Sequence, residues 1–467
     1  MKTALTAIYL LFTISVSAQI TLENVTPKIE SYVASLSRNG NAGQLLVSMN
    51  GKVWSKGYGM ADRERQEQFT PETISGIGSI TKQFTGAAIL KLEMMGKLSV
   101  YDLVSDHFEN VPSDKSEMTL HHLLTHSAGF PGAIGDDYES ITSNEFMNLA
   151  MKTPLLFEVG SQYEYSNVGY TILAILVEKL SGETYEQFLN KELFEPAEMW
   201  NTGYVLPLWT GKKMAVGYRK DKKWGKLNEK NWGEEGPYWH LKGNGGILST
   251  PSDMYRWHQA LMGNKILSEE AKKKYYTKHV AEGPEAQSYY GYGWAIFPTP
   301  RGTNLITHNG GNGIFLADFL RYPEEEVVIY YTTNSVSPQN RDVAWEVARM
   351  IFDAEYQATA DDLELRPLSA QQEEVVNGFK KMLEGSDDQT IDDFVNEFFE
   401  KGMIDMAPMS EHRKILGRMR NDLENAVFKE AGSALDEVSV FYESGRGPLT
   451  VLMIIQNGKV TGMGVEN

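Results

Sequence analysis

Hydrophobic and polar positions divide the chain into two regions that differ in character. From residue 19 to about 355, short apolar runs alternate with segments rich in Gly, Tyr and Trp and with many turn signals. After a turn-rich stretch, the remaining residues follow first a helical and then a strand-like spacing. A chain of 467 residues is too long for one ordinary domain. We therefore predict two domains, 19–355 and 370–467, joined by a linker over 356–369.

The first region contains strand signals near both of its ends. Apolar runs at 45–49 and 53–55 flank Asn-Gly at positions 50–51, which is typical of a β-hairpin. Two further runs, 313–319 and 327–331, are also strand-like. Because the residues between these ends are mostly helical or loop-like, the pattern predicts one sheet closed by the first and last segments, with a long helical insertion.

The helix that matters most for the chemistry is predicted over 79–95, with its apolar residues on one face and Gly96 as its end. The second region is predicted to form helices and then strands. Its helical spacing covers 375–383 and 391–399, and its strand-like runs are 438–442, 451–455 and 460–463.

The first residues have the pattern of a signal peptide. A basic start at Lys2 precedes a short apolar core, and small residues lead to Ala18. The apolar core is too short to span a hydrocarbon layer of about 30 Å comfortably, and no later stretch is long and apolar enough to span. We expect residues 1–18 to be removed after Ala18 and the protein to be periplasmic or secreted.

Composition excludes several classes of function. A formal net charge of -18 argues against nucleic acid and anionic membrane surfaces as partners. The absence of cysteine excludes disulfides, thiolate metal sites and a cysteine nucleophile. The nine histidines form no His-x-x-x-His pair or comparable ligand set, so we expect no metal and no cofactor.

The strongest candidate for chemistry is Ser-Ile-Thr-Lys at positions 79–82. A serine hydroxyl needs a base within hydrogen-bond reach, and residues i and i+3 share one face of a helix. Lys82 can therefore reach Ser79 at a helix N-terminus, where the helix dipole favours an oxyanion. Taken alone the motif is weak, because a chain of this length should show about two by chance. The alternative is an exposed lysine near a capping serine.

Two other segments add polar groups of the right kind. Tyr165 and Asn167 precede a helix and can share one cleft, although a packed tyrosine beside an Asn cap is the alternative. His-Asn-Gly-Gly at 308–311 follows a strand-like run, and its glycines allow a substrate backbone to approach closely. The alternative there is a tight turn with a surface histidine.

Together these segments resemble a known family. The order S-x-x-K, Y-x-N, H/K-x-G resembles the penicillin-binding-protein and class C β-lactamase superfamily of serine hydrolases. Segments 122–130 and 245–254 also look like family segments, L-L-T-H-T-S-G-L and G-G-L-x-S-T-x-x-D-L. The resemblance implies an α+β fold in which an antiparallel sheet is flanked by helices and carries an inserted helical domain. The C-terminal region resembles small α+β cone modules of the nuclear-transport-factor-2-like type.

The resemblance assigns a role to each matched residue. Ser79 is the expected nucleophile and Lys82 the expected proton acceptor. Tyr165 is expected to move a proton to the leaving group or to activate the deacylating water. Which of Lys82 and Tyr165 is the general base stays open, because close groups titrate together. His126 and Ser127 are expected to be structural. The remaining assignments are the backbone N–H groups of Ser79 and Gly311 for the oxyanion, and Asn167, His308, Asn309 and Gly310 for substrate binding.

Two departures from the family affect the substrate. His308 stands where many relatives have lysine, so a fixed positive charge becomes a partial one near neutral pH. Asn309 replaces the usual Ser or Thr. Both changes argue against a dedicated β-lactamase and favour an enzyme that opens an amide or ester bond in a small peptide or acyl compound through a Ser79 acyl-enzyme. Three types of enzyme fit this description, and the sequence does not choose between them: a D-alanyl carboxypeptidase, a D-aminopeptidase and an esterase. The alternatives are a β-lactamase and a non-catalytic penicillin-binding-like sensor, and the sequence does not determine the oligomeric state.

Overall fold

The computed structural model describes residues 21–283, 286–360, 367–405, 407–434, 437–444 and 447–466. The chain forms two compact units, Met1–Ala360 and Asp361–Asn467. The expected signal peptide, residues 1–18, and part of the expected linker, 361–366, lie outside the described residues.

The first unit is built on an eight-stranded sheet in the order β2-β1-β14-β13-β12-β11-β10-β9. Neighbouring strands are antiparallel throughout. β1 lies directly beside β14, so the first and last segments of the unit close the sheet, as the sequence predicts. The strands are β1 (Gly43–Met49), β2 (Lys52–Tyr58), β9 (Val280–Ala281), β10 (Tyr289–Tyr290), β11 (Ala295–Pro298), β12 (Asn304–Gly311), β13 (Leu316–Tyr322) and β14 (Val327–Thr333).

Local turn chemistry explains where these strands begin and end. Asn50 and Gly51, with φ of 49° and 75°, form the predicted turn between β1 and β2. The prediction was wrong at the other end of the unit. The expected strand at 313–319 begins only at Leu316, because Asn312 Oδ1 accepts from the Ile314 and Phe315 backbone N–H groups and folds that segment into a turn.

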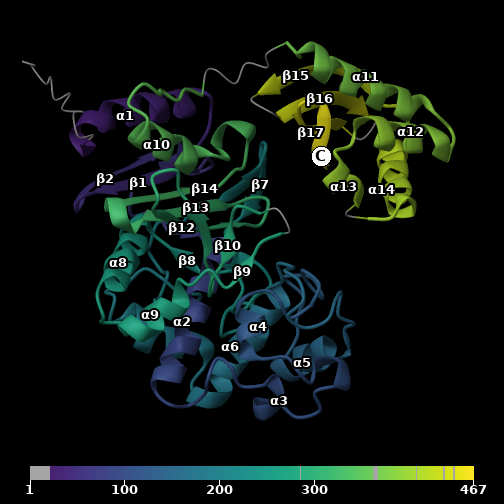
Figure 1. The fold of residues 1–467 in the computed structure, drawn as a ribbon. Helices are drawn as coiled ribbons and strands as arrows, with labels where there is room; N and C mark the ends of the chain where they lie inside the picture. The colour runs from purple at the N-terminus through teal and green to yellow at the C-terminus, as the bar shows by residue number, and fades with distance from the viewer. Residues whose placement is uncertain are drawn as a thin grey trace, which may run out of the picture. The chain divides into compact units, whose positions relative to one another are not determined.

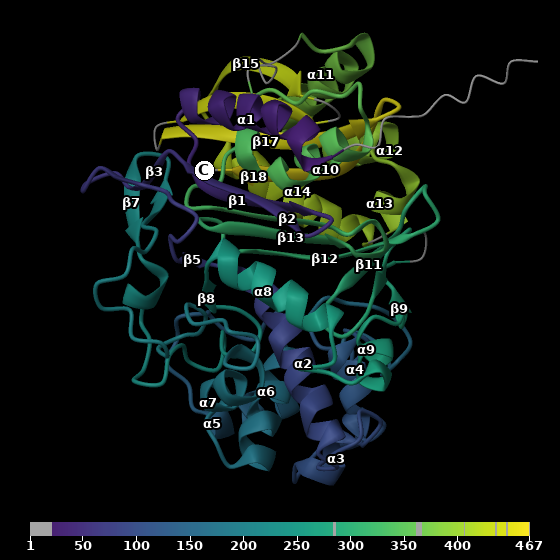
Figure 2. The ribbon, with the colours of Figure 1, turned by 90° about the vertical axis from the view of Figure 1, so that its left-hand side faces the viewer.

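Two helical layers cover the two faces of the sheet (Figures 1 and 2). α1 (Leu22–Arg38) and α10 (Val343–Phe352) lie on one face, and α2 (Thr81–Met94), α8 (Pro251–Met262) and α9 (Glu269–Tyr275) lie on the other. Alternation along β1 separates the two cores. Leu45 and Val47 pack with α1 and α10, whereas Leu46 belongs to the core around α2.

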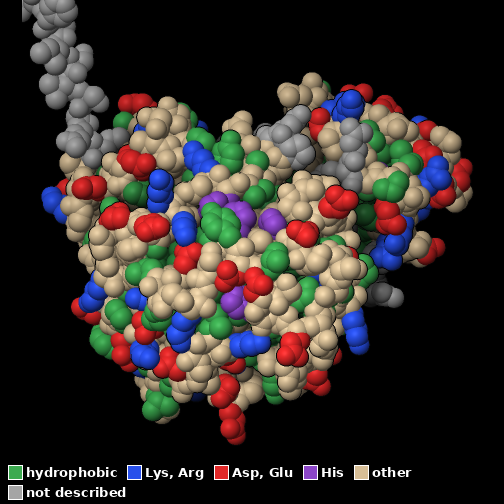
Figure 3. Space-filling model, turned by 60° about the horizontal axis from the view of Figure 1, so that its bottom comes forward, with side chains coloured by type: hydrophobic (Ala, Val, Ile, Leu, Met, Phe, Trp, Pro, Cys, Tyr) green, Lys and Arg blue, Asp and Glu red, His purple; other side chains and the backbone are tan. Residues whose placement is uncertain are grey.

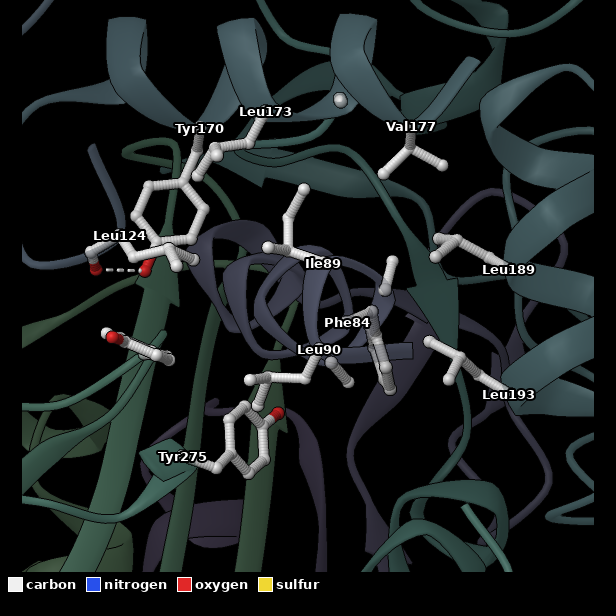
Figure 4. Close-up of a cluster of buried hydrophobic side chains, with 14 of the residues drawn as sticks. Phe84, Ile89, Leu90, Leu124, Tyr170, Leu173, Val177, Leu189, Leu193 and Tyr275 are labelled. Carbon is white, nitrogen blue, oxygen red and sulfur yellow. Dashed lines mark hydrogen bonds between the residues drawn. The ribbon is translucent and has the colours of Figure 1, made fainter. Parts of the chain in front are cut away.

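α2 passes through the centre of the helical part of the unit (Figure 4). It is buried on nearly every side, so its apolar residues are not confined to one stripe. Phe84, Ile89 and Leu90 point in different directions from this helix into surrounding side chains. Full burial of each such side chain contributes about 1.5–3 kcal/mol relative to exposure. This packing holds the N-terminus of α2, and with it Ser79, in one place.

Further helices extend the helical part of the first unit, and α6 packs against α2 (Figure 4). Three small two-stranded sheets complete this unit. Among the described residues, no helix combines the length and the apolar character needed to cross a membrane. The further helices are α3 (Val104–His107), α4 (Leu120–Leu124), α5 (Ser143–Lys152), α6 (Asn167–Ser181) and α7 (Tyr185–Leu189). The small sheets pair β3 (Met60–Asp62) with β4 (Glu67–Gln68), β5 (Ser75–Gly76) with β8 (Leu248–Ser249), and β6 (Gly217–Arg219) with β7 (Lys222–Gly225).

The second unit places helices before an antiparallel four-stranded sheet, in agreement with the predicted α+β pattern. The predicted turn at Asn457 and Gly458 joins β17 to β18. Strand β15 was not predicted, because its Lys429–Ser433 stretch lacks apolar alternation and its pairing contains a bulge after Phe428. The likeness to cone modules stays a prediction. The elements are α11 (Ala370–Glu384), α12 (Asp388–Phe398), α13 (Lys401–Asp405), α14 (Met409–Asp422), β15 (Val427–Ala434), β16 (Glu437–Ser444), β17 (Gly447–Gln456) and β18 (Lys459–Glu466).

Candidate active site

Ser79 lies in a short 3-10 turn, Gly78–Ile80, that leads directly into α2. Gly78 has a φ of +53°, a conformation that disfavours residues with a side chain, and it turns the chain from β5 into the helix. The segment before Ser79 is held by β8, and the Ile77 N–H donates to the Ile247 carbonyl at 3.0 Å. The family-like segment 245–254 therefore supports the backbone that presents Ser79.

Lys82 is fully buried and its Nζ touches three oxygen atoms. The distances are 2.7 Å to Asn167 Oδ1, 2.9 Å to the Asn244 carbonyl and 3.3 Å to Ser79 Oγ. Burial lowers the pKa of Lys82 well below its usual value, and the negative charge of Asp137 opposes this shift only in part. A neutral amine has two N–H groups, and these can donate hydrogen bonds to the two carbonyl oxygens. Its lone pair is then available to the Ser79 hydroxyl.

Tyr165 lies close to both Lys82 and Ser79. The Lys82 Nζ is 4.7 Å from the centroid of its ring. The phenol oxygen is buried and makes no hydrogen bond of ordinary length to the described residues, although the Ser79 hydroxyl is close enough to affect its pKa. Burial raises the pKa of Tyr165 and the Ser79 hydroxyl lowers it by less. A protonated phenol without a partner is therefore available to a reacting group beside Ser79.

The loop that carries Tyr165 and Asn167 rests on the family-like segment 122–130. The Ser166 N–H donates to His126 Nδ1 at 3.1 Å, and the His126 ring lies 4.3 Å from the Tyr165 ring between centroids. The Ser127 carbonyl accepts from the Gly160 N–H at 2.8 Å. His126 and Ser127 therefore hold the loop in place, which agrees with the structural roles expected for them.

β12 brings its glycines against the nucleophile. Beyond Thr307, β12 has no pairing with β11, so this edge is open toward Ser79. A Cβ added at Gly310 would lie 2.0 Å from the Ile77 carbonyl oxygen, and one added at Gly78 would lie 2.4 Å from the Gly311 nitrogen. Only glycines allow this approach. The predicted strand ended before His308, whereas β12 runs through Gly311.

His308 is buried and neutral, which corrects the expected partial charge. Its Nε2 lies 2.9 Å from the Tyr290 hydroxyl and its Nδ1 lies 2.5 Å from the Asn309 carbonyl oxygen. A neutral imidazole fits both contacts, with Nδ1–H donating and Nε2 accepting. Burial lowers the pKa of His308 to about 3. The expectation was wrong because the sequence does not show that this side chain is enclosed.

Two contributors to the site were not predicted from the sequence. The Asn244 carbonyl holds Lys82, and Tyr290 holds His308. Asn244 is adjacent to the recognised segment at 245, but a backbone acceptor leaves no residue-type signal. Asn309 lines a second cavity together with Tyr165 and His308, whereas the small pocket at Ser79 is lined by Gly311 of the same strand.

Histidines also group away from this site. Histidine side chains reach the surface near the middle of the face drawn in Figure 3. The rings of His121 and His279 lie 4.9 Å apart between centroids, and His279 stacks on Tyr292. Burial and the neighbouring histidines lower the pKa of His121 to about 4. Within the described ranges, no group of three or more His, Cys, Asp or Glu residues is placed to hold a metal ion.

The part of the chain that contains Ser79, Tyr165 and His308 matches a known protein family. The sequence profile of the Beta-lactamase family matches residues 28–351. The chain belongs to this family. It is thus a serine hydrolase of the β-lactamase and penicillin-binding-protein type. PbpX of Bacillus subtilis, which is named as a penicillin-binding protein, is 31% identical over 285 residues that cover 60% of this chain and 68% of PbpX.

Two solved structures resemble this member of the Beta-lactamase family. A penicillin-binding protein from Bacillus halodurans has a TM-score of 0.58 and 26% identity, covering 69% of this chain and all of that one (100%). An octameric penicillin-binding protein homologue from Pyrococcus abyssi has a TM-score of 0.62 and 22% identity, covering 93% and 94% of the two chains. These likenesses agree with the predicted fold class, an antiparallel sheet flanked by helices with a helical insertion.

Proposed function

We propose that this protein opens an amide or ester bond of a small peptide or acyl compound through an acyl-enzyme on Ser79. The observation that carries the proposal is the position of the Lys82 amine. The amine is buried and its pKa is lowered. It donates hydrogen bonds to two carbonyl oxygens, and its third neighbour is the Ser79 hydroxyl. This is the arrangement that an activated serine needs.

In the proposed first step Ser79 Oγ attacks the substrate carbonyl carbon while its proton moves to Lys82 Nζ. The Ser79 and Gly311 N–H groups are the proposed donors to the oxyanion. Collapse of the intermediate breaks the bond to the leaving group, which takes a proton through Tyr165. Water then attacks the acyl carbon, releases the acid and returns the proton to Ser79.

The type of hydrolase is proposed from the electrostatics around Ser79. β-Lactams carry a carboxylate, and a neutral His308 offers it no positive charge. We therefore place a peptidase, amidase or esterase before a β-lactamase. Turnover of nitrocefin at rates comparable with those for esters and peptides contradicts this order. A non-catalytic sensor predicts a stable Ser79 adduct and no turnover of an ester, amide and D-peptide panel.

Labelling with a fluorophosphonate probe tests the nucleophile. Wild-type protein should be labelled, and Ser79→Ala should lose the label while keeping its circular dichroism spectrum. Ser161→Ala is the matched control, because Ser161 is exposed and, in the part of the chain that the structure describes, its hydroxyl donates to the Glu158 carbonyl alone. Equal labelling of Ser79→Ala and wild type overturns the proposal.

Export is a separate proposal that rests on the sequence of residues 1–18. N-terminal sequencing of protein expressed with this leader in a Gram-negative host should begin at Gln19. Retention of residues 1–18 on cytoplasmic protein contradicts it.

A further inference from the structure

A small pocket lies directly beside Ser79, with a cavity volume of about 40 Å³. Its walls include Ser79 itself, glycines from three separate segments, and apolar side chains. Polar residues also line it, namely Asp137, Tyr138, Asn167, Asn244 and Asn312. A space of this size is close to that of one or two water molecules and accepts only a small chemical group. Whatever enters it lies next to the carbonyl carbon that Ser79 attacks.

Asp137 is the only charged residue among the described residues that line this pocket. It comes from the loop between α4 and α5, in the region that follows the family-like segment 122–130. The Asp137 carboxylate is half-buried, and within the described chain it has no ion-pair or hydrogen-bond partner. A carboxylate withdrawn from water without a partner is costly, and a bound cation offsets that cost.

The other groups near Ser79 compensate this negative charge only in part. Lys82 is held by Asn167 and Asn244, and its pKa is lowered by burial. His308 is neutral. Burial raises the pKa of Asp137, as does the adjacent Asp136, while Lys82 and His240 lower it. A substrate carboxylate in this pocket meets a like charge, and a substrate ammonium group meets an opposite one.

We propose that Asp137 binds the free α-ammonium group of an aminoacyl substrate. This rests on the proposed function, an acyl-enzyme on Ser79, and names its substrate class: amides or esters of an amino acid whose amine is unblocked. The α-ammonium is one carbon away from the scissile carbonyl, which matches a small pocket that adjoins the nucleophile. Ser79 takes the aminoacyl group, the C–N or C–O bond breaks, the leaving group is protonated, and water releases the free amino acid.

The test compares matched substrates. Alanine p-nitroanilide and p-nitrophenyl ester, as both enantiomers, are measured beside their N-acetyl counterparts at pH 7, below the usual α-amino pKa of about 7.7–8.0. Wild type should prefer the free amine by at least tenfold in kcat/KM. Asp137→Asn, which keeps the shape and removes the charge, should lower kcat/KM for the free-amine substrate by about 10–100-fold and change that for the N-acetyl substrate by less than threefold.

Two further variants keep the test decisive. Asp136→Asn is the matched control, because its side chain is exposed and, within the described residues, accepts a hydrogen bond from the Tyr138 N–H alone. It should leave the preference unchanged. Asp137→Lys should reverse the preference toward an acyl group with a carboxylate, such as a succinyl ester. Fluorophosphonate labelling of Ser79 is measured in every variant. If labelling is intact but neither substitution at Asp137 changes the preference, the inference is wrong and the proposed function stands. If wild type is not labelled, the proposed function itself fails.

Discussion

A Cβ atom built on Gly310 lies 2.7 Å from the backbone nitrogen of Ser79. Strand β12 and the nucleophile turn are thus in backbone contact, although the two residues are far apart in the chain. Since that nitrogen is a proposed oxyanion donor, the contact couples the position of the strand to the geometry of the proposed oxyanion site.

Substitution of Gly310 should therefore reduce the activity of the folded protein, beyond any loss that results from lower folding stability. Gly310→Ala forces β12 away from Ser79, and a misplacement of about 1 Å can cost about 100-fold in rate. We expect a loss of that order in kcat/KM for an ester substrate, measured at a temperature where circular dichroism shows a folded protein. Gly263→Ala is the control, because its nearest neighbouring atom is 4.0 Å away. Equal activity of both variants contradicts the proposed contact role.

Removal of the Lys82 amine should cost about 100- to 10,000-fold in the rate of Ser79 acylation. Lys82→Met keeps the buried apolar stem and removes the base. In wild type the acylation rate should rise with pH as Lys82 loses its proton, with a midpoint well below the ordinary lysine pKa. Stopped-flow acylation across pH 5 to 10 measures both effects. Lys91→Met, on the same helix and paired with Glu192 at 3.7 Å, should behave as wild type.

His308 should not titrate in the working range of the enzyme. Because its pKa in the folded protein is about 3, it is neutral at pH 5 and above. His308→Gln keeps an acceptor for the Tyr290 hydroxyl, so the inflections of kcat/KM between pH 5 and 8 should coincide with those of wild type. The free energy of unfolding differs instead. In wild type the lowered pKa makes stability fall as pH drops from about 6.5 toward 3, and the variant lacks this contribution. A kinetic inflection near pH 6 that disappears in the variant would show that His308 titrates.

Asp318 should destabilise the fold at high pH. Among the described residues its Oδ2 atom is buried without a hydrogen-bond partner, and burial, with the charge of Asp342, raises its pKa to about 7. A raised carboxyl pKa means that the folded state holds the proton more tightly, so stability falls as pH rises from about 4 to 7. Asp318→Asn should thus raise the free energy of unfolding at pH 8 by about 1–3 kcal/mol and change it little at pH 4.5. Urea denaturation at both pH values measures this.

The control for Asp318 is the fully exposed Asp221. Asp221→Asn should change the free energy of unfolding by less than about 0.5 kcal/mol at either pH. If Asp318→Asn has the same small effect at pH 8, the carboxyl group does not carry the predicted penalty.

Several features of this protein followed from local sequence signals. Asn50 and Gly51 adopt positive φ because the short hairpin turn requires it, and this can be read from two residues. The spacing of Ser79 and Lys82 places both on one helix face, so their proximity follows from helix geometry. The order of the segments predicted the family and the fold class, which the comparisons confirm.

Other features depended on which distant segments meet. The backbone carbonyl of Asn244 accepts a hydrogen bond from Lys82. Because every residue has a backbone carbonyl, this contact cannot be predicted from the residue type. His308 is neutral and the Lys82 pKa is low because both are enclosed, and burial is a property of the packed fold. Asp137 resembles any loop aspartate until the fold brings it to the pocket at Ser79. The sequence alone determined which reactive groups this protein carries, since residue types and their local spacing are properties of the sequence. Only the tertiary structure decided their charge states and neighbours, because solvation and electrostatic interactions act through space.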